Sequence, residues 1–140
     1  MKLLLLLLAA TTTLPRSIDG LPIGALPRQT LPAQGCAAYL FTVGATRALA
    51  AVATAQAGQL RLALDGRVVD LSREAGGPAG AFGFAPATTY RGDVTAVLEL
   101  AVAERRELAK GALVPTATLR IDRNGGDSVV IPMAGMIGCA

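Results

Sequence analysis

Few side chains in this 140-residue chain are of types that commonly do chemistry. It contains no His and no Trp, and its two cysteines, Cys36 and Cys139, lie far apart in the sequence. Redox-active cysteines favour a close Cys-x-x-Cys spacing that tunes the pKa of one thiol. We therefore predict one structural disulfide between Cys36 and Cys139. This bridge would close a loop of about 100 residues. A chain-entropy model gives such a bridge a stabilisation of the folded protein of about 4.7 kcal/mol.

General acid–base catalysis would fall to the carboxylates, because the chain has no His. The acids after residue 33 lie mostly at expected turns or outward strand positions, where solvation explains them: Asp65, Asp70, Glu74, Asp93, Glu99, Glu104, Glu107, Asp122 and Asp127. The turn at residues 124–127 matches only a fragment of a calcium loop, since it lacks the repeated acidic ligands. We predict no enzyme, no cofactor and no metal site, and rank a hydrolase with a carboxylate site third among the functions considered.

Two segments could instead contact a partner. Residues 75–84 are glycine-rich but lack the Lys and the Ser or Thr of a phosphate-binding loop, so we predict a flexible loop leading into a short strand. Residues 90–93 contain an Arg-Gly-Asp tripeptide that some adhesion proteins use, although ordinary turn chemistry explains it more simply. The candidate partner-binding residues are Gly80, Phe82, Phe84, Tyr90 and Arg91.

The first residues predict export. Lys2 precedes an apolar run at residues 3–10, which is typical of a secretory signal and shorter than the about 20 apolar residues of a transmembrane helix. We favour cleavage after Ala33; otherwise residues 15–33, with their spaced prolines, form an extended linker outside the fold. Residues 1–33 are thus expected to be signal peptide plus linker. The expected location is periplasmic or secreted, where a disulfide can form.

One domain, residues 34–140, is expected to follow. The formal net charge of the whole 140-residue chain is only +3, and the basic residues are scattered without interleaved aromatic residues. That distribution excludes nucleic acid as a partner. The expected partner is an unidentified protein or another component of the cell envelope, and the oligomeric state stays open.

The hydrophobic pattern of this domain predicts an all-β fold. Alternating apolar positions predict strands at residues 37–43, 60–64, 68–71, 94–103, 116–122 and 128–133. Asp65-Gly66 and residues 124–127 are typical hairpin turns, and Pro132 predicts an edge or a bulge. Residues 45–57 fit either a helix or a strand. We expect a small antiparallel sandwich or closed barrel of about seven to eight strands, with one disulfide joining its two ends.

Four stretches resemble small exported proteins of Gram-negative bacteria that have no assigned function. They are residues 35–40 (GCAAYL), 62–67 (LALDGR), 90–94 (YRGDV) and 130–139 (VIPMAGMIGC). The resemblance implies a periplasmic location and transfers no site.

The chain also resembles the periplasmic lysozyme inhibitors, which are small disulfide-bonded β-barrels, in the order of three segments. These are the hairpin at residues 64–67, Leu71-Ser72 and the loop at residues 80–82. The chain departs from them at the inhibitory loop, where a Ser-Gly-x-x-Tyr pattern is replaced by AGAFG at residues 79–83. We therefore expect an exported, non-catalytic β domain that acts as a periplasmic binding or envelope-associated module. A lysozyme-inhibitor-like protein is the alternative.

Overall fold

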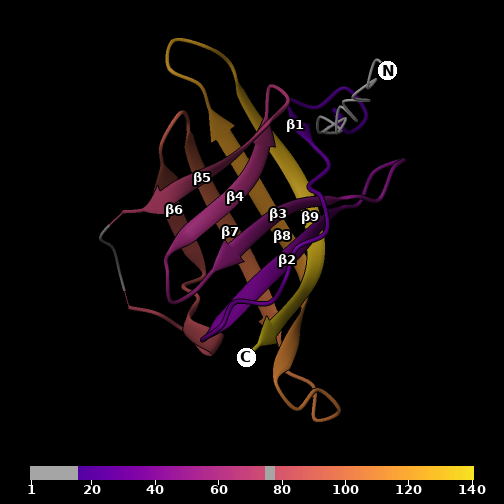
Figure 1. Ribbon diagram of the computed structural model, residues 1–140, viewed down its shortest axis with the longest axis vertical. Coiled ribbons are helices and arrows are strands. Elements are labelled where there is room, and N and C mark those ends of the chain that lie inside the picture. The colour runs from indigo at the N-terminus through magenta and orange to yellow at the C-terminus, as the bar shows by residue number, and fades with distance from the viewer. Residues whose placement is uncertain (1–15, 75–77) are drawn as a thin grey trace, which may run out of the picture.

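The computed structural model describes residues 16–74 and 78–140, and its regular structure is almost entirely β (Figure 1). The strands are β1 (Ile23–Gly24), β2 (Cys36–Thr42), β3 (Leu49–Thr54), β4 (Gln59–Leu64), β5 (Arg67–Arg73), β6 (Ala87–Arg91), β7 (Thr95–Ala103), β8 (Gly111–Asp122) and β9 (Ser128–Cys139). Among the described residues there is one 3-10 turn, η1 (Ala81–Gly83), which lies between β5 and β6. The predicted signal at residues 1–10 falls outside the described residues.

Eight of the strands form a closed antiparallel barrel, which decides between the two predicted architectures. The strand order is β4-β3-β2-β9-β8-β7-β6-β5, and pairing of β5 with β4 closes the ring. The short strand β1 is additional and pairs with the last two residues of β4. Closure pairs the strands that would otherwise be the open edges of a sheet.

Both predicted hairpins are present. At the turn between β4 and β5, Asp65 has φ 50° and Gly66 has φ 79°, the two positive values that a type I′ turn requires. The second hairpin joins β8 to β9, and its tip extends beyond the barrel (Figure 1). Pro132 immediately precedes Met133, where the pairing of β9 with β2 begins, and it pairs with Thr118 of β8; a residue without a backbone N–H thus lies where β9 has a partner strand on one side.

Inward positions of the strands alternate as predicted and fill the barrel. In β7, the side chains of Ala96 and Leu98 are buried, which confirms the strand predicted at residues 94–103, although many of its residues are good helix formers. The ambiguous Ala-rich segment also contains a strand, β3, whose four central residues are all buried. Small side chains suit this strand because it is covered on both faces. Tertiary packing has therefore overridden the helical propensity of alanine.

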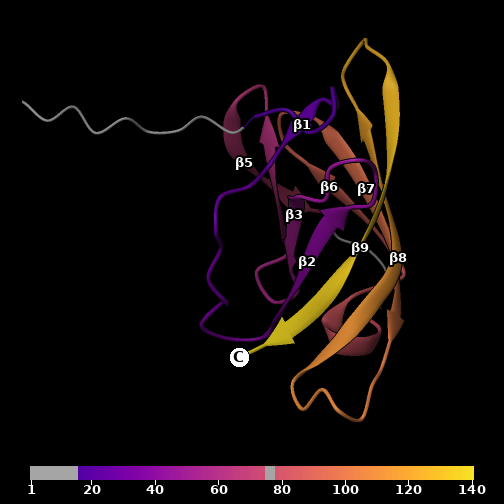
Figure 2. The same ribbon diagram turned by 90° about the vertical axis from the view of Figure 1, so that its right-hand side faces the viewer.

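The N-terminal segment, residues 16–33, is part of the fold, so the prediction that it lies outside the fold is wrong for these residues; the expected cleavage after Ala33 would remove side chains that pack on the barrel. Ile18 and Ile23 are buried with the barrel core, at 3% and 0% exposure. Leu26 is buried outside the barrel in a second cluster with Ala37, Val52 and Ala63. Figure 2 shows the segment running from β1 along the outside of the barrel toward the C-terminus. The prolines suggested a linker, but the apolar residues between them pack against the sheet.

The predicted disulfide is confirmed. Cys36 and Cys139 face each other as paired residues of β2 and β9, and their sulfurs are bonded. The backbone N–H of Ala140 donates to the carbonyl oxygen of Gly35 at 2.9 Å, so the hydrogen bonding continues beyond the bridge. The disulfide therefore joins the first and last strands of the barrel.

Candidate functional site: an apolar groove on the outer face of the barrel

The predicted partner-binding loop folds back onto the barrel. The N–H of Gly80 donates to the oxygen of Phe84 at 2.9 Å, and the N–H of Phe84 donates to the oxygen of Ala81 at 3.1 Å, which closes a compact turn around η1. Phe84 is buried at 5% exposure, and the partly buried Phe82 packs against the same core. Of this turn, only Gly80 and Ala81 are exposed. The expected role of Phe84 in partner contact is therefore wrong, because its ring completes the core.

Tyr90 requires the same correction, since it is 1% exposed inside the barrel. Burial raises the pKa of its phenol above the usual value. Arg91 is exposed at the end of β6, where the β6–β7 turn begins, and forms an ion pair with Glu74. Asp93 of the same tripeptide lies 3.4 Å from Arg67. Both charges of the Arg-Gly-Asp sequence are thus engaged within the fold, which agrees with the turn interpretation.

Phe84 and Tyr90 border one hollow of about 620 Å³, together with Arg73, Glu74 and residues 87–89. Residues 75–77, which separate Glu74 from Ala79 in the sequence, lie outside the described residues, and we assign the hollow no function.

The carboxylates do not converge. Three of the carboxylates accept side-chain hydrogen bonds: Asp65 from Arg123, Asp70 from Arg61, and Asp122 from Ser128. These hydrogen bonds lower the three carboxyl pKa values. A general acid needs a raised pKa, so the shifts run against that role. Within residues 16–74 and 78–140, no three acids or sulfur ligands gather as a metal would require.

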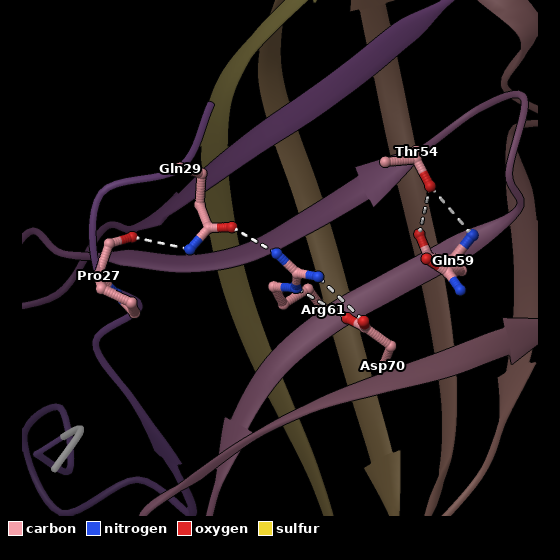
Figure 3. Close-up of polar contacts among 6 residues, drawn as sticks. All are labelled: Pro27, Gln29, Thr54, Gln59, Arg61 and Asp70. Carbon is pink, nitrogen blue, oxygen red and sulfur yellow. Dashed lines mark hydrogen bonds and ion pairs between the residues drawn. The ribbon is translucent and has the colours of Figure 1, made fainter. Parts of the chain in front are cut away.

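A polar network fastens the N-terminal segment to the barrel (Figure 3). Arg61 on β4 donates two hydrogen bonds to the Asp70 carboxylate on β5, at 2.8 and 3.0 Å, and a third to Gln29 Oε1 at 2.8 Å. Gln29 in turn donates from Nε2 to the carbonyl oxygen of Pro27 at 2.9 Å. Both polar ends of Gln29 are used. The network therefore holds residues 27–29 against β4 and β5. The hollow beside it has a volume of only about 170 Å³.

The strongest candidate site lies on the other half of the outer barrel face, over β2, β8 and β9. We call it the outer groove; its volume is about 570 Å³, and its lining residues are Phe41, Thr42, Val43, Arg47, Arg105, Leu113, Val114, Pro115, Ala134, Gly135 and Met136. Most of these side chains are apolar. Met136 is 50% exposed and Val43 is 42% exposed, although both are large hydrophobic residues. The outer groove is thus an apolar surface open to solvent.

Strand periodicity explains why apolar side chains point outward here. Inward residues Leu40, Ala112 and Ile137 are buried in the core. The residue next to each of them projects from the opposite face, because successive side chains alternate across a strand. These outward residues are Phe41, Leu113 and Met136. Pairing between β8 and β9 shifts between Val114 and Ala117, so the barrel wall is irregular beside the groove.

Two arginines border the outer groove. Arg47 belongs to the loop between β2 and β3, and Arg105 belongs to the loop between β7 and β8. Both are exposed, and neither forms an ion pair within the described part of the chain. The lining contains no acid. The groove therefore combines an apolar floor with two arginines that form no ion pair with a described residue, while Glu104 and Glu107 lie in the same loop as Arg105 and Asp19 accepts hydrogen bonds from Thr46 beside Arg47.

The sequence contains a signal for this surface that the strand assignments did not use. Around residues 39–43, 111–115 and 133–137, apolar residues occupy both alternating positions. A strand of that kind is covered on both faces or uses its outer face for contact. Of the candidate residues chosen from the sequence, none lines the outer groove.

The described residues contain no helix that is long and apolar enough to cross a membrane. No protein-family model, curated protein or solved structure matches the chain.

Proposed function

We propose that this protein is an exported, non-catalytic binding domain of the bacterial periplasm or envelope, and that it docks a partner protein in the outer groove. The observation that carries the proposal is the open apolar surface around Met136, bordered by two arginines that form no ion pair with any described residue. Contiguous exposed apolar surface is typical of interaction sites. Interface cores are also enriched in aromatic residues, Met and Arg, and the groove supplies all three.

The other half of the outer face supports this reasoning. There, the apolar residues Ala37, Val52 and Ala63 are covered by Leu26 of the N-terminal segment. Met136 and Val43 on the adjacent half have no such cover among the described residues. The outer face of the barrel is thus apolar on both halves. The N-terminal segment covers one half, and no described residue covers the half around Met136. We infer that the open half is covered by another molecule.

Export is part of the same proposal. It rests on the signal-like residues 1–10, and the Cys36–Cys139 bridge is consistent with it because disulfides persist in oxidising compartments.

Site-specific photocrosslinking in the producing bacterium tests the function. A photoreactive amino acid at position 136 lies in the outer groove, whereas one at position 130 lies on the same strand outside it; Val130 is 61% exposed and is the matched control. We expect a discrete adduct from position 136 that position 130 does not give. The partner identified from it should bind the purified protein about tenfold more weakly when Met136→Asp is introduced. Equal adducts from both positions, or none from position 136, would contradict the proposal.

Lysozyme inhibition is a second candidate. The closed barrel and the disulfide between its end strands agree with the layout of the periplasmic lysozyme inhibitors. The compact turn at residues 80–84 weighs against it, because a projecting loop would suit insertion into an active site. A lysozyme activity assay with the purified protein separates the two candidates. Inhibition that is unaffected by Met136→Asp would favour this second function.

A further inference from the structure

The charge around the outer groove restricts what can occupy it. We propose that the docked partner presents an acidic polypeptide segment, whose apolar side chains enter the groove while its carboxylates pair with Arg47 and Arg105. This inference rests on the proposed function and specifies the chemistry of the partner. It follows from the lining, which has two exposed arginines, several apolar side chains and no acid.

The placement of the two arginines favours an occupant that carries more than one negative charge. Arg47 follows β2, and Arg105 follows β7, so two separate loops contribute them. Apolar contact with Phe41, Leu113 and Met136 would bind any hydrophobic segment. Pairing with both arginines would discriminate acidic segments from basic ones, because like charges placed opposite each other cost binding free energy.

A polypeptide suits the groove better than a lipid tail. The groove lies on the outside of a closed barrel and is open to solvent. Small-molecule sites usually enclose most of the ligand surface, whereas a docked chain segment needs contact along only one side. A second copy of this protein is also disfavoured, since a twofold contact made by the same patch on both copies would bring four arginines together.

Methionine provides a direct probe of this surface. Met133 and Met136 lie on the same strand, but Met133 is 2% exposed in the core and Met136 is 50% exposed in the groove. The full-length chain labelled with 13C at the methionine methyl groups therefore reports groove and core separately by NMR. The substitution Met136→Leu assigns the groove signal and keeps the surface apolar.

Three flexible 12-residue peptides serve as the ligands: one of Leu, Glu and Gly, one of Leu, Lys and Gly, and one of Ser, Glu and Gly. We expect the Leu–Glu peptide to shift the Met136 methyl signal saturably and to leave Met133 nearly unchanged. The Leu–Lys and Ser–Glu peptides should bind at least tenfold more weakly. Raised salt should weaken the Leu–Glu complex, because the arginines are exposed.

Charge-reversal variants supply the matched control. Arg47→Glu with Arg105→Glu should weaken Leu–Glu binding about tenfold and strengthen Leu–Lys binding. Arg28→Glu with Arg106→Glu changes the net charge equally at exposed positions that do not line the groove, and should leave both affinities unchanged. Equal binding of the acidic and basic peptides would overturn the charge preference while leaving docking in the groove intact.

The remaining outcomes each contradict the inference. If no peptide shifts the Met136 methyl signal, the inference that the groove binds an acidic segment is wrong. The crosslinking result alone then decides whether the groove docks a protein. Broadening of Met136 by phosphatidylglycerol vesicles without a peptide response would assign the groove to a membrane surface. A Met136 shift that depends only on protein concentration would assign it to a second copy of the chain.

Discussion

Arg123, at the start of the β8–β9 turn, contacts both carboxylate oxygens of Asp65, which lies 58 residues earlier in the β4–β5 turn. Each distance is 3.2 Å. Next to this pair, Arg67 contacts Asp93 in the β6–β7 turn. Three turns that are far apart in the sequence are therefore joined by opposite charges at one end of the barrel.

This arrangement predicts a dependence of stability on pH. The hydrogen bonds from Arg123 lower the pKa of the Asp65 carboxyl in the folded protein below its unfolded value. The contribution is therefore fully present above the ordinary aspartate pKa of about 3.9 and is lost as the pH falls through the lower folded value. Asp65→Asn should lower the urea midpoint modestly at pH 7, and the difference from the unmodified protein should vanish near pH 2.

The choice of asparagine matters for this test, because Asp65 has a positive φ that Asn also tolerates. Asp127→Asn, at an exposed turn position without an ion pair among the described residues, is the control. A difference for Asp65→Asn that persists at pH 2 would show that the charge is not its cause.

The disulfide should contribute strongly to stability. Cys36 and Cys139 are separated by 103 residues, so the bridge restricts the unfolded chain over nearly the whole barrel. Replacing both by Ala should lower the free energy of unfolding by about 2–5 kcal/mol. Urea denaturation with and without reductant measures the difference. If reductant destabilised the Ala variant as much as the natural protein, the effect would not arise from this bridge.

The N-terminal segment should be needed for full stability. Ile23 has no exposed surface, and Ile23→Ala should cost about 3 kcal/mol through the cavity it leaves. Leu31→Ala, in the same segment but at 57% exposure, should cost much less. A chain that starts at Gln34 lacks Ile18, Ile23 and Leu26 together and should melt at a clearly lower temperature than one starting at Arg16. Equal melting temperatures would mean that the segment is dispensable.

The close contact between β2 and β9 requires glycine at position 135. A Cβ atom there would lie 1.8 Å from the carbonyl oxygen of Tyr39, so the strands would have to move apart. Gly135→Ala should lower the free energy of unfolding by about 3 kcal/mol. Gly44→Ala, where the nearest atom would be at 3.7 Å, is the control and should change it little. Similar melting curves for the two variants would contradict this explanation.

Local features of this fold were predictable where one physical signal dominated. Alternation in β7 outweighed its helical composition, and Asp65-Gly66 specified a hairpin turn. The choice between barrel and sandwich could not be made, since closure depends on pairing between distant strands such as β2 and β9. Propensity could not decide between helix and strand at β3, because its alanines are buried in the barrel core and Val52 on the outer face by segments that propensity does not consider.

The candidate site was less accessible to sequence reasoning. Phe82 and Phe84 follow a glycine-rich stretch and suggested an exposed loop, but a turn of backbone hydrogen bonds directs them into the core. The outer groove is assembled from three strands, and its arginines come from two further loops. Their proximity arises from strand register, which the sequence does not state.

Because the disulfide joins the first and last barrel strands, it also determines how the molecule would respond to being pulled at its ends. Tension applied before residue 16 and after Ala140 would first peel away the segment of Ile18, Ile23 and Leu26. It would then reach Cys36 and pass through the sulfur bond directly to Cys139, bypassing the residues between them. With the bridge intact, the barrel would therefore stay folded under stretching that detaches its N-terminal segment. The reduced protein would extend through its whole length.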